Sequence, residues 1–155
     1  MEISDILTAK DVIASLDASS KKQALQELAN HAANATGLPG REIFNTLLQR
    51  ERLGSTGIGH SIAIPHAKLE GIDKIHAVFA RLSTPIEFDA VDNQPVDLLF
   101  LLIAPVGAGA DHLKALSRVT RLLRDAELTT RLRSARDAVA LHSVLTEPHP
   151  ASNAA

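Results

Sequence analysis

The segment Val96–Ala104, V-D-L-L-F-L-L-I-A, most limits how this chain can fold, because it is apolar at every position except Asp97. A membrane-spanning helix needs about 20 apolar residues, so this run is too short to cross a bilayer, and we expect a protein that is not membrane-embedded. An apolar run without polar alternation is typical of a strand buried on both faces. We therefore expect an α/β fold in which 96–104 lies at the centre of a sheet.

The rest of the chain supplies the helices and strands that such a fold requires. Apolar residues recur every three or four positions in several segments, and Ser19 or Ser20, Pro39 and Asp111 stand where helices are expected to begin. The predicted helices are 21–36, 41–52, 112–124 and one or two within 127–145, where Val139 is among the residues expected to be buried. The predicted strands are 12–16, 61–64, 75–82 and the central 96–104, with a short extended piece at 85–88.

Three glycines, Gly54, Gly57 and Gly59, fall within six positions just before a short apolar strand. Glycine lets the backbone turn tightly and approach a ligand closely. Pro65 then fixes φ before His66 and removes one backbone donor, so this histidine is expected to leave the strand at a defined angle. A neutral imidazole can attack through one nitrogen while the other donates a hydrogen bond, and nearby N–H groups can hold an anion. Spacing alone is more typical of a plain turn and of a satisfied polar residue at a strand end.

A second histidine, His112, lies on the apolar face of a predicted helix. His112, Leu116, Val119 and Leu123 are separated by steps of four, three and four residues, which places them on one side. The side chain is therefore expected to point inward from the first helical turn, where the helix dipole favours an anion. Taken alone, the pattern is more typical of a core histidine whose hydrogen bonds are satisfied.

Composition narrows the classes of function. With 155 residues the chain is long enough for one ordinary domain, expected over 1–146, followed by a disordered tail over 147–155. It contains no cysteine, which excludes disulfides, thiolate nucleophiles and cysteine-ligated zinc. The net charge of −2 and the aromatic content of 3% argue against nucleic-acid binding. The N-terminus has no apolar signal core, so we expect a stand-alone cytoplasmic protein.

Three parts of the sequence resemble those of a known family. G-S-T-G-I-G at 54–59 followed by I-A-I-P-H-A-K at 62–68 is similar to the phosphorylation-site signature of phosphotransferase-system enzyme IIA, in the branch of fructose, mannitol and nitrogen-related proteins. V-D-L-L-F-L-L-I-A-P followed by D-H-L-K-A-L-S is similar to the strand and helix that bring a second histidine to that site. T-P-I-E-F-D-A-V-D-N-Q-P-V-D-L-L-F resembles the nitrogen-related subgroup. The resemblance implies a single domain with a central mixed β-sheet flanked by helices on both faces.

The same resemblance assigns roles to individual residues. It implies that His66 is the phosphorylated nucleophile and that His112 stabilises the phosphoryl group, with no metal and no cofactor. The residues that would cradle the phosphate or support the site are Arg52, Gly54, Ser55, Thr56, Gly57, Gly59 and Pro65. Two positions depart from the expected pattern, since Ser61 and Ala67 stand where the family leads us to expect glycine.

The implied function is that of a nitrogen-related enzyme IIA. Such a protein accepts a phosphoryl group from an HPr-like phosphocarrier, which enzyme I charges from phosphoenolpyruvate, and it regulates target proteins such as kinases or transporters. One alternative is a stand-alone fructose-type enzyme IIA that passes phosphate to a sugar permease. Another is a regulatory binding module that keeps the fold but acts without phosphorylation.

Other classes of protein fit less well. His60 and His66 are six apart across a strand, but they lack the carboxylate partner of a zinc hydrolase. The glycine segment has no lysine that would make it a P-loop. Arg118, Arg121 and Arg124 form a stripe at near-helical spacing, which is more typical of a solvated helix face than of a DNA-binding surface.

Overall fold

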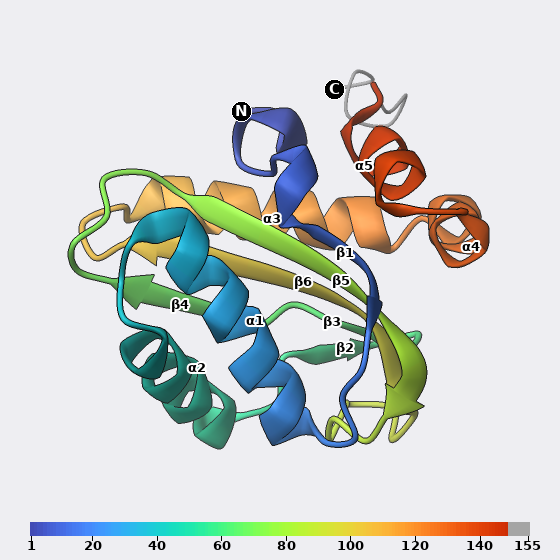
Figure 1. Cartoon of the computed structure of the whole chain (residues 1–155), viewed down its shortest axis with the longest axis horizontal. Coiled ribbons are helices and arrows are strands. Elements are labelled where there is room, and N and C mark those ends of the chain that lie inside the picture. Colours follow the sequence, from blue (N-terminus) through green and yellow to red (C-terminus); the bar gives the residue numbers. More distant parts are fainter. Residues whose placement is uncertain (149–155) are drawn as a thin grey trace.

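A computed structural model describes residues 1–148 of the chain and shows a mixed sheet between two layers of helices (Figure 1). The strands follow the order β1-β5-β6-β3-β2, and β4 also pairs with β6. The strands are β1 (Val12–Leu16), β2 (Gly57–Gly59), β3 (Ile62–Ala63), β4 (His66–Leu69), β5 (His76–Ile86) and β6 (Val96–Pro105). The helices are η1 (Ile3–Asp5), η2 (Ala9–Asp11), α1 (Lys21–Thr36), α2 (Gly40–Leu53), α3 (Ala110–Leu123), α4 (Ala126–Ser134) and α5 (Ala138–Thr146).

The apolar run identified in the sequence is the central strand, as predicted. β6 pairs antiparallel with β5 on one side and parallel with β3 and β4 on the other. The seven consecutive residues 98–104, and Val96 before them, are almost fully shielded from solvent, whereas Asp97 is only partly buried. The mixed sheet with a doubly covered centre is thus the α/β architecture that the sequence led us to expect.

Each face of the sheet has its own apolar core. One core lies under α1 and α2 and takes the side chains of Val78, Ala80 and Leu99 from the sheet. The other lies under α3, α4, α5 and η1 and takes Phe79 and Phe100, whose rings meet edge to face at 6.2 Å. Alternate residues of β5 point to opposite cores, as expected for a strand that is covered on both faces.

One helix begins at a predicted capping residue, and two others are capped by aspartates. Ser20 accepts a hydrogen bond from the Gln23 N–H at the start of α1, and Gly37 ends that helix in the left-handed conformation, φ 80°. Residues 126–146 form two helices, and Asp125 and Asp137 cap them through their side chains.

Other boundaries differ from the prediction. Pro39 is the N-cap of α2 rather than a first-turn residue. Gly109, not Asp111, precedes α3, because the chain leaves β6 through a turn in which residue 109 has φ 52°, a left-handed backbone that favours glycine. Val139 is 72% exposed, since α5 turns Leu141 and Leu145 toward the core and leaves position 139 on the outer side. The predicted extended piece 85–88 is partly absorbed into a longer β5.

The end of the chain is described only in part. Glu147, which the sequence placed in a disordered tail, caps α5 with its N–H, and its carboxylate forms an ion pair with Arg131. The remainder of the predicted tail, 149–155, lies outside the described residues. Within the part of the chain that is described, each helix is too short or too polar to cross a lipid bilayer.

Candidate functional site

The glycine-rich segment forms a small hairpin rather than an open loop. β2 runs antiparallel to β3, and the turn between them holds His60 at φ 57° and Ser61 at φ 65°. The Asp92 carboxylate accepts a hydrogen bond from the His60 N–H at 3.0 Å, and the Ser61 carbonyl accepts one from the Asp97 N–H at 3.0 Å. The left-handed backbone at Ser61 gives a physical reason for expecting glycine there.

Gly57 and Ser55 fit this hairpin against the segment that follows β5. A Cβ atom on Gly57 would lie 2.8 Å from the Cβ of Ala90, so only glycine allows this approach. The Ser55 hydroxyl accepts a hydrogen bond from the Gly57 N–H at 3.0 Å and donates one to the Phe88 carbonyl at 2.8 Å. The packing of Gly57 against Ala90 and the bond from Ser55 to Phe88 therefore fix the hairpin in place just before His66.

Thr56 is the best-anchored residue of the segment. It is 4% exposed, and both its N–H and its hydroxyl donate to the carboxylate of Glu51, the former at 3.1 Å. Its carbonyl accepts a hydrogen bond from the Ile64 N–H at 3.0 Å. Thr56 thus joins the end of α2 to the residues immediately before the predicted nucleophile.

His66 begins β4 instead of ending the preceding strand. The buried Pro65 uses its carbonyl to accept the Leu102 N–H at 3.0 Å, and His66 lies opposite Leu102 in the parallel pairing of β4 with β6. The Nδ1 atom of His66 lies 2.8 Å from the Ile64 carbonyl. A carbonyl only accepts, so Nδ1 carries the proton and Nε2 keeps its lone pair in the neutral ring.

His112 lies beside this ring, as the helical spacing predicted. The two imidazole centroids are 5.7 Å apart and the rings are tilted by 48°. His112 is 5% exposed and sits in the first turn of α3, and among the described residues its Nδ1 has no hydrogen-bond partner. Two imidazoles therefore converge near the N-terminus of a helix, where the helix dipole favours an anionic group.

Both histidines are biased toward the neutral state. Burial is the main reason that the pKa of His66 lies below its ordinary value, and the charge of Arg50 lowers the pKa further, while the bond to Ile64 and the charge of Glu51 oppose this. Burial also lowers the pKa of His112, helped by the charges of His66 and Lys68. A neutral His66 keeps a nucleophilic nitrogen available below the pH at which an ordinary histidine would be protonated.

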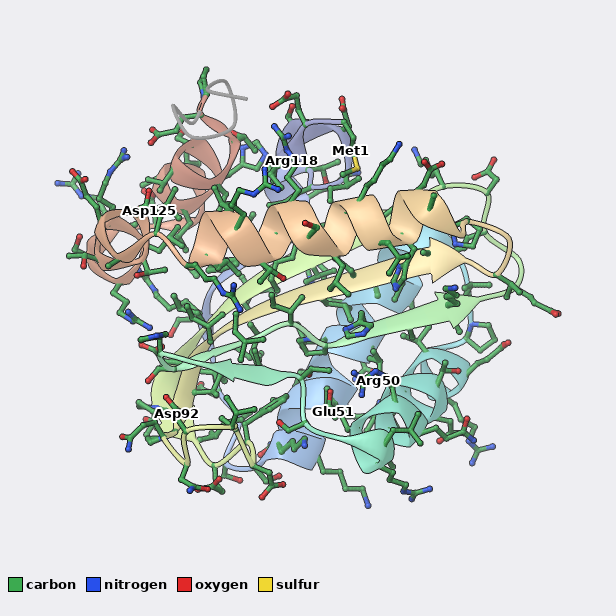
Figure 2. The ribbon with its side chains drawn as sticks, turned by 180° about the vertical axis from the view of Figure 1, so that it is seen from behind. Met1, Arg50, Glu51, Asp92, Arg118 and Asp125 are labelled. Carbon is green, nitrogen blue, oxygen red and sulfur yellow. The ribbon has the colours of Figure 1, made fainter. Side chains whose placement is uncertain are left out.

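Arg50 is a basic residue whose charge acts on the His66 ring, and the sequence reasoning missed it. Arg50 and Glu51 lie next to each other where α2 ends (Figure 2). The partly buried Arg50 donates to the Gly54 carbonyl at 2.9 Å, whereas the predicted Arg52 is exposed in the last turn of the helix. A signal for this face was present, because Ile43, Leu47 and Glu51 follow one another in steps of four, which continues the buried stripe to the end of α2.

The structure thus brings together most of the predicted site residues. His66 lies beside His112 and follows Pro65 in the chain, and Ile64 links it to Thr56 by hydrogen bonds. Ser55, Gly57 and Gly59 shape the adjoining hairpin. Gly54 accepts the Arg50 hydrogen bond at the junction of α2 and the segment. His60, considered as a partner of His66 in a zinc site, is exposed in the turn of the hairpin.

Comparison with known proteins finds relatives that match this chain over nearly its whole length. Residues 5–147 match the family model of the EIIA 2 component of the phosphoenolpyruvate-dependent sugar phosphotransferase system. A nitrogen regulatory protein of Bradyrhizobium diazoefficiens is 55% identical over 148 residues, which cover 96% of this chain and 97% of that protein. A nitrogen regulatory protein of Klebsiella oxytoca is 44% identical over 149 residues, covering 95% and 91% of the two chains.

A solved structure extends the comparison to three dimensions. The crystal structure of nitrogen regulatory protein IIA-Ntr from Neisseria meningitidis superposes with a TM-score of 0.89 at 31% identity, covering 93% of this chain and 99% of that one. The family resemblance carried by the sequence motifs is therefore confirmed. This chain belongs to the EIIA 2 family of the phosphotransferase system and, within that family, to the nitrogen regulatory IIA-Ntr proteins.

Proposed function

We propose that this protein takes a phosphoryl group on Nε2 of His66 from an HPr-like phosphocarrier and regulates cytoplasmic target proteins through its phosphorylation state. Enzyme I transfers the phosphoryl group from phosphoenolpyruvate to the carrier. The targets are proteins such as kinases or transporters. Family membership supports the phosphotransfer chemistry, and the names of the relatives support a regulatory role rather than sugar uptake.

The hydrogen bond from Nδ1 of His66 to the Ile64 carbonyl is the observation that carries the proposal. At 2.8 Å it fixes the tautomer in which Nε2 is the unprotonated nitrogen, and among residues 1–148 no hydrogen bond reaches Nε2. The partly buried ring is held at the start of a strand instead of on a free loop. These features prepare one nitrogen for in-line attack and hold the other in place.

The transfer is balanced without a metal or an external base. Nε2 of His66 forms a bond to phosphorus while the phosphorus–nitrogen bond of the carrier's protonated phosphohistidine breaks. The carrier ring leaves with that electron pair as a neutral imidazole, and the positive charge passes to the His66 ring, where Nδ1–H still donates to Ile64. A loose transition state of this kind needs positioning and charge stabilisation, which Arg50, His112 and the N-terminus of α3 are placed to supply.

The regulatory consequence follows from the charge that the modification adds. A phosphoryl group brings about −1.5 to −2 charge units to a site that is otherwise lined by neutral histidines. A charge that is buried unpaired in an interface costs several kcal/mol, which is enough to decide whether a partner docks. The protein can therefore present two distinct surfaces at the same position, one for each state.

Intact-mass analysis tests the proposal directly. Wild type and His66→Ala are incubated with phosphoenolpyruvate, enzyme I and the HPr-like carrier, and His142→Gln serves as a control for a histidine that bonds to Leu7 at a distance from the site. We expect one acid-labile phosphoryl adduct on wild type and on the control, and none on His66→Ala. An unmodified wild type in the presence of a carrier shown to be active would overturn the proposal and favour a module that acts without phosphorylation.

A further inference from the structure

The two helices that cover one face of the sheet, α1 and α2, each carry a charged residue on their buried stripe. Lys21 lies four residues before the buried Leu25 at the start of α1. Glu51 lies four residues after the buried Leu47 near the end of α2. The Glu51 side chain is 3% exposed and that of Lys21 is 19% exposed, so neither is an ordinary surface charge.

Neither charge is placed to stabilise its own helix. Lys21 is the first residue of α1, and Glu51 lies in the last turn of α2. A cation at a helix N-terminus and an anion at a C-terminus each oppose the helix dipole, at a cost of typically about 0.3–1 kcal/mol. Their positions therefore have to be explained by what the two side chains contact.

The two side chains form one buried network. The Lys21 Nζ atom lies 2.9 Å from Oε1 of Glu51 and 4.8 Å from the centre of the Phe88 ring. The same carboxylate also accepts both donors of Thr56. Glu51 thus has a counter-ion and two hydrogen-bond donors, which is the arrangement that a buried carboxylate requires.

The network continues through backbone groups to the predicted nucleophile. Glu51 holds the N–H and hydroxyl of Thr56, the Thr56 carbonyl accepts the Ile64 N–H at 3.0 Å, and the Ile64 carbonyl accepts Nδ1 of His66 at 2.8 Å. Each link fixes the position of the group that makes the next one. A shift of the carboxylate is therefore passed on to the carbonyl that orients the imidazole.

We propose that Glu51, with Lys21 as its counter-ion, is a positioning residue that sets the tautomer and the direction of the His66 imidazole through Thr56 and Ile64. The inference rests on the proposed phosphotransfer function and adds a residue that orients the imidazole for it. Glu51 does not touch the phosphoryl group, so it acts on the reaction only through His66. A purely stabilising role is a weak explanation, because buried ion pairs often contribute little net stability compared with apolar residues of similar volume.

Three variants separate the links of this network. Glu51→Gln keeps the shape of the side chain and removes its charge, Thr56→Val removes the buried hydroxyl, and Thr56→Ser retains it. Leu141→Ala, a cavity in the fully buried part of α5, serves as a control that destabilises the fold without touching the network. Thermal unfolding of all four variants identifies those that are folded at the assay temperature.

The first measurement is nitrogen-15 NMR of the His66 ring in the unphosphorylated protein. We expect the Nδ1–H tautomer in wild type, Thr56→Ser and Leu141→Ala. In Glu51→Gln and Thr56→Val we expect a larger share of the Nε2–H tautomer. The His66 pKa should also fall in Glu51→Gln, because the negative charge that raises it is gone. This measurement needs no carrier, so it decides the inference even if wild type is not phosphorylated and the proposed function fails.

The second measurement is the rate of phosphoryl transfer as a function of carrier concentration. In Glu51→Gln and Thr56→Val we expect the rate at saturation to fall by up to about 100-fold, as for a displacement of about 1 Å at a reacting group, with an unchanged half-saturation concentration. Folded Glu51→Gln and Thr56→Val proteins with wild-type tautomer and rate would overturn the inference. It would also be overturned if Leu141→Ala, at equal loss of melting temperature, slowed the transfer as much.

Discussion

The two histidines of the site are held in different ways. His66 lies at the end of a network of hydrogen bonds and charges that starts at Lys21 and Glu51 and runs through Thr56. His112 is held by packing, because it lies in the first turn of a helix whose inner face is formed by Ala115, Val119 and Leu123. The first ring has its Nδ1 bonded, and the second has a buried Nδ1 without a partner in the described part of the chain.

This difference separates the orientation of an imidazole ring from the position of the helix or strand that carries it. Hydrogen bonds fix the direction of a ring and its tautomer, whereas apolar packing fixes where a helix lies but leaves ring chemistry open. We therefore expect changes on the polar side to affect the chemistry of transfer before they affect stability. On the packed side we expect the reverse order.

The largest effect on stability is expected on the packed side. Leu123→Ala leaves a cavity in the core under α3, where the side chain is 1% exposed, and should lower the free energy of unfolding by about 2–5 kcal/mol. Urea unfolding measures this loss. The transfer rate of the remaining folded protein should stay close to wild type, and a large drop in that rate would show that packing also sets the aim of His66.

A change at His112 itself should act on the reaction. His112→Gln removes an imidazole that lies 5.7 Å from His66, centroid to centroid, and we expect transfer to slow by about 100-fold, as when one donor to a developing charge is lost. The adduct should still form on His66. Rapid-quench measurement of single-turnover transfer gives the rate, and a complete loss of the adduct would mean that His112 is the acceptor.

Acid should destabilise the fold through both rings at once. The pKa values of His66 and His112 lie below the usual 6.5, so between that pH and the lowered values the unfolded chain binds more protons than the folded one. Stability is therefore complete above about pH 6.5 and declines as the pH falls through the folded-state values. Unfolding of wild type and of the His66→Gln, His112→Gln double variant across pH 5–8 should give a flatter profile for the double variant. The slope that remains includes His76, whose pKa is also lowered by burial.

The smallest effects are expected at the two positions that depart from the family pattern, and they should have opposite signs. Ser61→Gly relieves a left-handed backbone, φ 65°, and should stabilise the fold by roughly 0.5–1 kcal/mol. Ala67→Gly removes a methyl group that is 6% exposed from strand β4 and should destabilise it by a similar amount, roughly 0.5–1 kcal/mol. Melting temperatures of the two variants, measured side by side, decide the signs.

The packed side of the molecule was the easier one to predict. The apolar run 96–104 predicted the central strand. The spacing of Leu116, Val119 and Leu123 predicted that His112 lies on the inner face of its helix. Such periodic patterns involve residues that are close together in the chain, so they can be detected from the sequence alone. The exposed Val139 shows the limit, because a short helix offers too few turns to fix which face is buried.

The polar side was harder because its contacts join distant segments. The hairpin β2–β3 packs so closely against Ala90 that position 57 has no room for a Cβ atom. No local sequence pattern indicates this contact. Arg50 and Arg52 differ only in the face of α2 on which they lie, and motif matching chose the exposed one. The charges at Lys21 and Glu51 do lie on the buried stripes of their helices, and that coincidence is the signal that pairs them.

The most direct test of the central claim is phosphorus–proton correlation NMR of the phosphorylated protein with nitrogen-15 in its histidine rings. The orientation of His66 predicts a phosphoryl group bonded to Nε2 of that ring, with the Nδ1 proton still donating to Ile64. A phosphoryl group on Nδ1 of His66, or on His112, would contradict the account, because the hydrogen bond that is held to aim the ring would then be absent or irrelevant.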